Sequence, residues 1–469
     1  MRPSPKLRTD PDSCSSVRSL LLRLYGAFTT LAQPLVRRKL RRRAVAEPGY
    51  AHAVEERFGR YDEAAAGTGW CWVHAVSLGE ARAAGILIAE LRRQYPGIPI
   101  LLTHGTATGR EEGAKLLEPG DLQVWQPWDA PAAVASFLDR FQPRIGVLME
   151  TEVWPELTAA CAERGIPLVL ANARLNENSL ASAERLGWLA RPAYSSLAAV
   201  WAQTEADSHR LVSLGAKVEG VYGNLKFDAT PDARQLATAA RLRGQLPRPV
   251  VMLASSRDGE EAQLLEVLKR FGALAPVPPA QDAVQSISRR VHDVQWMIVP
   301  RHPQRFDEVA ALIESHGFAV ARRSTAGAPA ESEIWLGDSL GEMALYYGLA
   351  DVALLGGSFE ALGGQNLIEA AACGCPVIMG PSTYNFAEAA ELSLAAGASL
   401  RVSDMEHAVT AALKLVEHQD RREAMAEAAQ AFAGANRGAA QRTAAAVLSI
   451  AEAAPLPVSA EERTEPNFD

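Results

Sequence analysis

The chain has 469 residues, of which 48% are hydrophobic and 22% are charged, and its formal net charge is −8 at pH 7. This length exceeds one ordinary hydrophobic core and predicts two domains, while the composition argues against a disordered or fibrous protein. The five cysteines show no C-x-x-C spacing, which argues against a disulfide framework or a structural zinc site and favours a reducing cytosol.

The amino-terminal residues differ in charge from the rest of the chain. Residues 1–43 contain eleven Lys and Arg against two Asp, which makes this arm about +9 and leaves about −17 for the remainder. The run Val17–Val36 is apolar but carries two arginines, so it falls short of a spanning helix of about 20 apolar residues and does not match a signal peptide. With the basic residues 37–43, it predicts an amphipathic helix within residues 1–47 that lies on an anionic membrane surface; a solvated helix is the alternative.

Short apolar runs alternate with Ala-, Leu-, Glu- and Arg-rich segments from Trp70 onward. This βαβα rhythm predicts parallel, doubly wound sheets, with helices over Glu80–Gln94 and Ala130–Phe141 in the first. The strands expected in the first series are Cys71–Ala75, Ile98–Thr103, Leu122–Trp125, Ile145–Met149, Leu168–Ala171 and Ala198–Ala202.

A break around Gly223–Pro231 separates this series from a second one. We therefore expect a first domain over 48–228, a second over 229–435, a closing helix over 436–454 and a disordered tail over 455–469. A surface loop is expected over 275–288. The strands of the second series are Val250–Ala254, Trp296–Pro300, Glu333–Leu336, Val352–Leu355 and Val377–Met379.

Polar residues follow the first-domain strands, at the ends where doubly wound sheets bind ligands. Glu80 is either a general base facing a substrate hydroxyl or a helix-end acid, and Ser77 and Gly79 are expected to let its loop turn tightly. Thr106 suits an oxygen-rich ligand or an ordinary N-cap.

Two acids, Glu150 and Glu152, directly follow the fourth strand. Loops at strand ends carry function disproportionately, so at least one of the two is expected to be functional. They are expected to bind sugar hydroxyls or to pair with Arg174 and Lys226. The acids and hydroxyls of the first domain thus favour a hydroxyl acceptor.

The second domain carries glycine-rich turns and cations instead. Gly356-Gly357-Ser358 ends one strand, and Gly364-Gln365-Asn366 precedes an Ala-rich helix whose first turn holds Glu369. Glycines at a strand end let N–H groups approach a phosphate, the helix adds its positive end, and Glu369 is placed to accept hydrogen bonds from a ribose. Arg301-His302-Pro303 ends another strand, where Arg301 suits a phosphate. A nucleotide-bound donor is favoured; a purely structural turn is the alternative.

Other chemistries lack their motifs. The sequence contains no Walker A lysine motif, no G-x-G-x-x-G after the first strand and no H-E-x-x-H. Its one Asp-x-Asp, Asp10-Pro11-Asp12, lies in the basic arm, far from any strand end. ATP-dependent phosphoryl transfer, dinucleotide redox chemistry and a metal site are therefore not favoured.

Taken together and in this order, the motifs resemble those of the bacterial transferases of 3-deoxy-D-manno-octulosonic acid (Kdo), which attach Kdo to the lipid A precursor. The resemblance extends from Phe58 to about Phe386, and each motif is weak by itself. The matching segments are Val76–Glu80, Met149–Glu152 with Trp154-Pro155, Asn172–Leu175, Gly223–Asp228, Val299–Pro303 and Gly356–Ser358.

This resemblance implies a GT-B fold, with two Rossmann-like domains facing a central cleft, and inverting transfer of Kdo from CMP-Kdo to lipid IVA. Glu80 corresponds to the residue regarded in that family as the catalytic base. Acceptor contacts are expected at Ser77, Gly79, Thr106, Glu150 and Glu152. The resemblance implies no cofactor, metal or nucleic acid, and a location on the cytoplasmic leaflet of the bacterial inner membrane. Donor contacts are expected at Arg301, His302, Pro303, Gly356, Gly357, Ser358, Gly364, Gln365, Asn366 and Glu369.

Two positions depart from the family pattern, since His is expected where Gln365 and Arg257 stand. Both lie on the donor side, so they concern the contacts to CMP or Kdo. Two alternatives stay open: another GT-B nucleotide-sugar transferase or epimerase, and a catalytically inactive membrane-surface protein that binds lipid and nucleotide.

Overall fold

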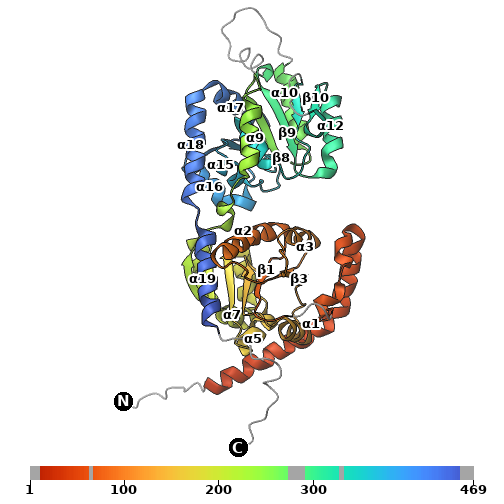
Figure 1. Cartoon of the computed structure of the whole chain (residues 1–469), viewed down its shortest axis with the longest axis vertical. Coiled ribbons are helices and arrows are strands. Elements are labelled where there is room, and N and C mark those ends of the chain that lie inside the picture. Colours follow the sequence, from red (N-terminus) through yellow and green to blue (C-terminus); the bar gives the residue numbers. More distant parts are fainter. Residues whose placement is uncertain (1–10, 63–66, 273–290, 327–331, 455–469) are drawn as a thin grey trace, which may run out of the picture. The chain divides into compact units, whose positions relative to one another are not determined.

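A computed structural model describes residues 11–62, 67–272, 291–326 and 332–454, without the side chains of residues 11–19. The loop expected over 275–288 and the tail expected from Pro455 lie outside the described residues. The chain divides into two compact units (Figure 1), the first made of residues 1–228 and 438–469 and the second of residues 229–437.

The first unit contains a parallel sheet of seven strands among its described residues, in the order β3-β2-β1-β4-β5-β6-β7. Its inner strands are buried on both faces, which explains their nearly continuous apolar sequences. The strands are β1 (Cys71–His74), β2 (Ile100–His104), β3 (Leu122–Trp125), β4 (Ile145–Met149), β5 (Leu168–Ala173), β6 (Ala199–Ala202) and β7 (Val218–Val221).

Helices cover both faces of this sheet. One core contains residues of α4 (Pro131–Phe141), α5 (Pro155–Glu163), α7 (Gly187–Ser195) and α8 (Glu205–Ser213). The other face packs against α2 (Leu78–Gln94) and α19 (Ala439–Ala453). The remaining elements are α3 (Ala107–Ala114), α6 (Glu177–Arg185), η1 (Pro48–Ala51), η2 (Val54–Phe58) and η3 (Leu225–Asp228).

The second unit repeats this plan, with strand order β10-β11-β9-β8-β12-β13-β14. Its strands are β8 (Val250–Ser256), β9 (Gln295–Pro300), β10 (Val320–Arg322), β11 (Ile334–Leu336), β12 (Val352–Leu355), β13 (Val377–Met379) and β14 (Ser399–Arg401). The other elements are α9 (Ala233–Arg243), α10 (Glu260–Gly272), η4 (Pro303–Arg305), α12 (Phe306–Ser315), α13 (Arg323–Ala326), α14 (Met343–Leu349), α15 (Leu367–Ala372), η5 (Tyr384–Phe386), α16 (Ala387–Ala395), α17 (Met405–Glu417) and α18 (Gln419–Ala435).

The expected doubly wound α/β architecture is confirmed, and all eleven expected strands are present, four with the expected bounds and seven with changes of one or two residues at their ends. Three strands were missed: β7, β10 and β14. All three are outer strands of four residues or fewer, and none has a fully buried sequence pattern. Their pairing depends on the neighbouring strand more than on their own residues.

The strand order of each sheet creates a topological switch point. In the first unit the order reverses at β1, which lies between β2 and β4; in the second it reverses at β8, which lies between β9 and β12. Doubly wound sheets bind ligands beyond the carboxyl ends of the strands at such a point. The residues that follow β1, β4, β8 and β12 are therefore the first to consider for function.

A single helix, α1 (Pro11–Ala46), contains both the apolar run and the basic cluster of the amino-terminal arm. It packs closely against the first unit, because a Cβ at Gly26 would lie 2.7 Å from Cγ of Pro131. The Tyr25 hydroxyl donates a hydrogen bond to Asp129 at 2.8 Å, and the Trp128 indole donates to the Thr29 carbonyl at 2.8 Å. No helix among the described residues is long and apolar enough to cross a membrane.

Candidate functional site

Glu80 lies in the first turn of α2, directly after β1. The Ser77 hydroxyl is the N-cap and donates to Glu80 Oε1 at 3.0 Å, while the Val76 N–H donates to Oε2 at 2.9 Å. Ser77 Oγ in turn accepts from the Glu80 N–H at 3.4 Å, so this is a variant of the capping box in which the carboxylate binds the N–H before the N-cap, and the helix-end role is real. Each carboxylate oxygen still keeps a lone pair, because an ionised carboxylate offers about four acceptor positions. The geometry is therefore compatible with both roles.

Burial raises the pKa of Glu80, the Val76 N–H lowers it, and the nearby charge of Glu150 raises it again, leaving a net upward shift. A raised carboxyl pKa makes the ionised group a better proton acceptor near neutral pH. A carboxylate whose pKa is raised by burial and a neighbouring acid, at a switch point, has the properties expected of a general base.

The neighbouring turn residues have specific local roles. Thr106 caps α3, accepting from the Gly109 N–H at 3.1 Å, and its hydroxyl donates to the Val76 carbonyl at 2.8 Å. It thus connects the β2 turn to the turn that carries Glu80. The expectation that Gly79 serves a tight turn is wrong, because it lies inside α2 without a positive φ. A Cβ at Gly79 would meet only Ser77 Oγ, at 4.0 Å, so this glycine leaves open space beside Glu80.

Glu150 is held between two cations. It follows β4 with a left-handed backbone, φ 58°, and is 5% exposed. Arg174 Nε lies 3.0 Å from its Oε2, and Lys226 Nζ lies 3.5 Å from its Oε1. The pairing that the sequence left open is therefore present. A buried carboxylate requires such compensation, since an unpaired one would be costly.

Glu152 has a different environment. Burial raises its pKa to about 7, and the charge of Glu80 contributes to the same shift. Among the described residues, no ion pair reaches Glu152, in contrast to Glu150. The structure therefore distinguishes the two acids: Glu150 is neutralised by cations, and Glu152 is a half-buried carboxyl that titrates near neutral pH beside Glu80.

In the second unit, a buried carboxylate occupies the glycine-rich turn. Glu260, fully buried at the start of α10, accepts from the N–H groups of Arg257 at 2.9 Å, Gly357 at 2.7 Å and Phe359 at 3.1 Å. The Gly356 N–H pairs with the Ala254 carbonyl. The N–H groups of Gly356 and Gly357 thus have internal partners, and a phosphate that bound the Gly357 N–H would have to displace Glu260. Glu260 was not expected from the sequence as a site residue, although its place one turn after the end of β8 was a usable signal.

Ser358 supports the same turn: its hydroxyl contacts the Leu355 carbonyl and accepts from the Gly380 N–H at 2.8 Å. Gly364 has φ 73°, a conformation that favours glycine. A Cβ at Gly357 would lie 3.1 Å from Gln365 Nε2, so the Gln365 side chain lies over this turn. Asn366 caps the six-residue α15, and Glu369 is half-buried within it.

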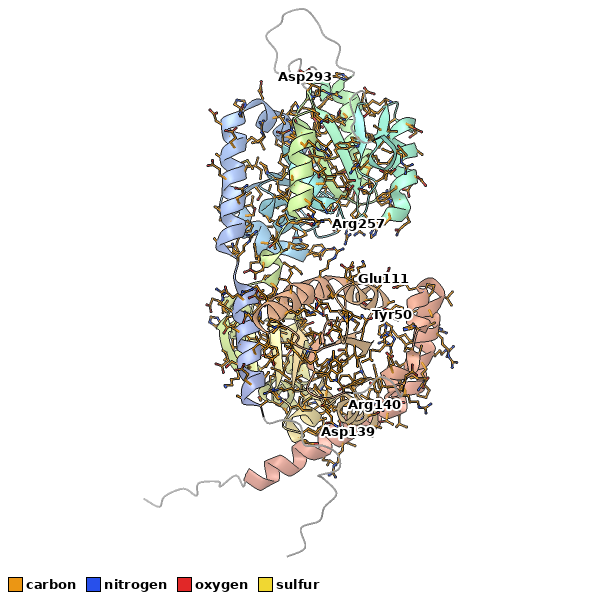
Figure 2. All side chains as sticks on the ribbon, in the orientation of Figure 1. Tyr50, Glu111, Asp139, Arg140, Arg257 and Asp293 are labelled. Atoms are coloured by element: carbon orange, nitrogen blue, oxygen red, sulfur yellow. The ribbon has the colours of Figure 1, made fainter. Side chains whose placement is uncertain are left out.

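Several cations follow β8 and β9. Arg257, labelled in Figure 2, and Arg301 are both half-buried, and the Arg301 N–H donates to the Ser256 carbonyl at 3.0 Å. Burial lowers the pKa of His302, and Arg257, Arg301 and Arg305 lower it further. Pro303 is exposed at the start of η4. Arg305 pairs with Asp258, Glu261 and Glu308, so Arg257 and Arg301 are the two guanidinium groups at this edge that suit an anionic ligand.

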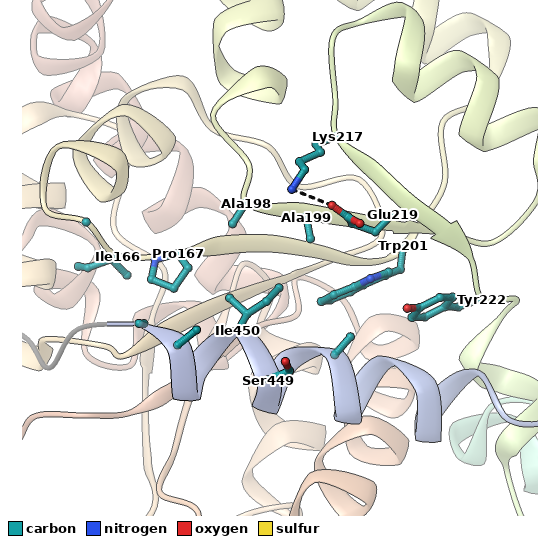
Figure 3. A pocket seen from close by; sticks show the side chains of 14 residues that line it. Ile166, Pro167, Ala198, Ala199, Trp201, Lys217, Glu219, Tyr222, Ser449 and Ile450 are labelled. Atoms are coloured by element: carbon teal, nitrogen blue, oxygen red, sulfur yellow. Dashed lines mark ion pairs between the residues drawn. The ribbon is translucent and has the colours of Figure 1, made fainter.

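A groove of about 680 Å³ lies elsewhere, between α19 and the strands β6 and β7 (Figure 3). Its lining includes the stacked rings of Trp201 and Tyr222, whose centroids are 5.9 Å apart, and the Lys217–Glu219 ion pair. None of the site residues expected from the sequence lines it. Within the described ranges, no group of three or more His, Cys, Asp or Glu is placed to hold a metal ion.

Two family models match the chain. The model described as 3-deoxy-D-manno-octulosonic-acid transferase (kdotransferase) matches residues 52–229, and the model described as glycosyl transferases group 1 matches residues 323–432. The first covers most of the unit that contains Glu80 and Glu150, and the second covers much of the unit that contains the glycine-rich turn.

Similar proteins carry the same description. The chain is 47% identical to the 3-deoxy-D-manno-octulosonic acid transferase of Bordetella pertussis over 79% of this chain and 85% of that protein. It is 31% identical to the enzyme of that name from Haemophilus influenzae, over 89% and 96%. A glycosyltransferase structure from Rickettsia africae matches 81% of this chain and 98% of that one, at 14% identity and a TM-score of 0.52. These similarities and the two parallel sheets establish a GT-B fold.

Proposed function

Because this chain belongs to the family of 3-deoxy-D-manno-octulosonic acid transferases, and is thus a glycosyltransferase, we propose that it transfers Kdo from CMP-Kdo to the lipid A precursor lipid IVA, with inversion at the transferred sugar. The observation that carries the acceptor side is Glu80: a carboxylate at the switch point of the first unit, with a raised pKa and a free lone pair on each oxygen.

The proposed reaction is a single displacement. An acceptor hydroxyl attacks the anomeric carbon of Kdo, its proton passes to Glu80, and the bond from that carbon to the CMP phosphate oxygen breaks as CMP leaves with the electron pair. One base on the acceptor side and charge stabilisation on the leaving side suffice for this step. Glu152, half-buried beside Glu80, accepts a hydrogen bond from the acceptor sugar, and Thr106, Ser77 and Gly79 shape the same surface.

CMP-Kdo is a substrate, and no cofactor or metal takes part in this proposal. Arg301 neutralises the CMP phosphate together with Arg257, which stands where the family has His. Gln365, Asn366 and Glu369 lie after the glycine-rich turn and contact the nucleotide, with Glu369 on the ribose. His302 and Pro303 shape the cationic edge. Since Glu260 already binds the Gly357 N–H, the segment Gly356–Ser358 and Gly364 act by shaping the turn beside the nucleotide.

The proposed membrane contact is made by α1. Its outward side chains form an apolar stripe, defined as Leu20, Leu24, Phe28, Leu31 and Leu35, which are 56–80% exposed. Their spacing of three and four places them on one helical face, while Gly26 and Thr29 are buried against the body. Five such side chains entering lipid, followed by the basic residues 38–43, supply both signals needed for stable peripheral docking on the anionic cytoplasmic leaflet.

Release of CMP tests the donor and the acceptor separately. Purified protein on lipid IVA vesicles is supplied with CMP-Kdo, generated in place, or with UDP-N-acetylglucosamine. We expect CMP release that requires both CMP-Kdo and lipid IVA. Turnover of the UDP-sugar instead would favour another GT-B transferase or an epimerase, and nucleotide binding without release would favour an inactive binding protein.

A further inference from the structure

Asn172, near the end of β5, has a left-handed backbone with φ 53° and is 2% exposed. The pairing of β5 with β6 shifts register between Leu170 and Ala173, so the strand bulges at this residue. Asparagine enters this region more readily than most residues, but a left-handed non-glycine residue persists only where its surroundings hold it there, and such positions cluster at functional sites. The contacts on either side of Asn172 show what the bulge achieves.

The backbone around the bulge holds Glu150. The Glu150 N–H donates to the Ala171 carbonyl at 3.0 Å, and the Arg174 N–H donates to the Glu150 carbonyl at 3.2 Å. Asn172 lies between these two partners, so its left-handed turn lets β5 bind both backbone groups of Glu150. The same contacts leave the Arg174 side chain 3.0 Å from the Glu150 carboxylate.

The Asn172 side chain reaches the second cation. Its Oδ1 accepts from the Leu225 N–H at 3.0 Å, at the start of η3. The next residue is Lys226, whose Nζ lies 3.5 Å from Glu150 Oε1. One buried asparagine thus supports both cations: the backbone places Arg174, and the amide oxygen places Lys226.

Two further amides extend this arrangement. Gln203 Nε2 donates to the Asn172 carbonyl at 2.8 Å, and Asn224 Nδ2 donates to Gln203 Oε1 at 3.1 Å. Asn224 Oδ1 then accepts from the Lys226 N–H at 3.0 Å. The backbone at Lys226 is therefore fixed by two hydrogen bonds, one from its own N–H and one from the N–H of Leu225. These bonds restrict the position of the Lys226 Cα, from which the side chain extends.

We propose that Asn172 is a positioning residue of the acceptor site, which holds Arg174 and Lys226 on Glu150 and so controls the negative charge facing Glu80. The proposal rests on the proposed function. The charged groups that face Glu80 are Glu150 and Glu152 after β4 and Arg174 after β5. Because the charge of Glu150 raises the pKa of Glu80 and Arg174 lowers it, loosening Arg174 makes Glu80 harder to ionise. Loosening Lys226 acts in the same direction through Glu150, whose charge is then less compensated.

Asn172→Gly tests this directly. Glycine adopts the left-handed conformation without strain, so the backbone is preserved while the acceptor for the Leu225 N–H is lost. We expect faster hydrogen exchange at the Leu225 amide, a fall in kcat/KM for lipid IVA of about tenfold or more, and an acid limb of the pH–rate profile moved to higher pH. A purely structural role would lower the melting temperature and leave that limb in place.

The matched control is Asn176→Ala, which removes an exposed asparagine whose Oδ1 caps α6 through the Ser179 N–H. It should lower the melting temperature through loss of this cap and leave the acid limb unchanged. Lys226→Ala should move the limb in the same direction as Asn172→Gly. The double variant should have the same kcat/KM as Lys226→Ala alone, because Asn172→Gly acts through the Lys226–Glu150 ion pair that Lys226→Ala already removes.

The outcomes separate this proposal from the proposed function. If the wild type transfers Kdo but Asn172→Gly keeps the wild-type acid limb, the positioning role fails alone. If Asn172→Gly does not fold, two other results would overturn the positioning role. One is an acid limb that is unshifted in Lys226→Ala, and the other is rapid hydrogen exchange of the Leu225 amide in the wild type. A wild type without transfer overturns both.

Discussion

Glu80→Gln separates the chemical role of Glu80 from its structural one. The amide oxygen can still accept from the Val76 N–H, and the amide N–H₂ can donate to Ser77 Oγ, so the cap at the start of α2 survives. Burial raises the pKa of Glu80, which means that the fold penalises its charge; a neutral amide avoids that penalty. We therefore expect the free energy of unfolding at pH 7 to change by less than about 1 kcal/mol.

The catalytic effect should be much larger. A positioned general base contributes typically about 10²–10⁴-fold, which corresponds to about 3–5 kcal/mol of transition-state stabilisation. Transfer rates measured on lipid IVA vesicles should fall by that factor, while the affinity for CMP, measured by titration calorimetry, should stay at the wild-type value.

Glu90→Gln is the control, because Glu90 lies on the same helix, pairs with Arg93 and is remote from the turn after β1. It should retain wild-type transfer. If Glu80→Gln turns over at a near-normal rate, Glu80 is not the base. If it unfolds, the capping box is its main role and the reasoning from the raised pKa is refuted.

Three further predictions follow from the same contacts. The pKa of Glu152 is raised to about 7 in the fold, so the stability that this carboxyl contributes is present below about pH 4.5 and is lost as pH rises through 7. Glu152→Gln should therefore have a higher melting temperature than the wild type at pH 8 and nearly the same melting temperature at pH 4.5. An equal difference in melting temperature at the two pH values would contradict the shift. Glu260→Ala leaves three N–H donors without their partner and should lower the affinity for CMP at least tenfold. The control is Glu266→Ala, at an exposed residue of the same helix, which should leave that affinity unchanged. Equal CMP affinities of the two variants would show that the turn does not need Glu260. The double change Phe28→Asp and Leu31→Asp should reduce cosedimentation with anionic vesicles at least tenfold without changing the melting temperature, and unchanged binding would rule out the apolar stripe as the docking surface.

The sequence predicts the sheets well where strands are buried on both faces. β4 and β12 are continuous apolar runs, and both were located to the residue. β7 was missed because Glu219 and Gly220 interrupt it, and its place in the sheet depends on pairing with β6. Pairing of this kind is a tertiary effect that local sequence does not encode.

The candidate site was predictable where acidic side chains follow the end of a strand. Glu80 and Glu150 were found in this way, and the pairing of Glu150 with cations was one of two open readings. The partner of a backbone N–H cannot be read from sequence, so nothing indicated that Glu260 binds the Gly357 N–H. Asn172 was noticed only within a motif, because its left-handed conformation is set by contacts with Glu150 and Leu225, which are distant in sequence.

The most direct test of the account is the intact mass of the lipid product. Wild-type protein, Glu80→Gln and Glu90→Gln are each incubated with lipid IVA vesicles and CMP-Kdo generated in place, and the extracted lipid is measured by mass spectrometry. We expect the mass of lipid IVA to rise by one or more Kdo units with the wild type and Glu90→Gln, and to stay unchanged over the same time with Glu80→Gln. An unmodified acceptor after incubation with folded wild-type protein that binds CMP would contradict the proposed transfer.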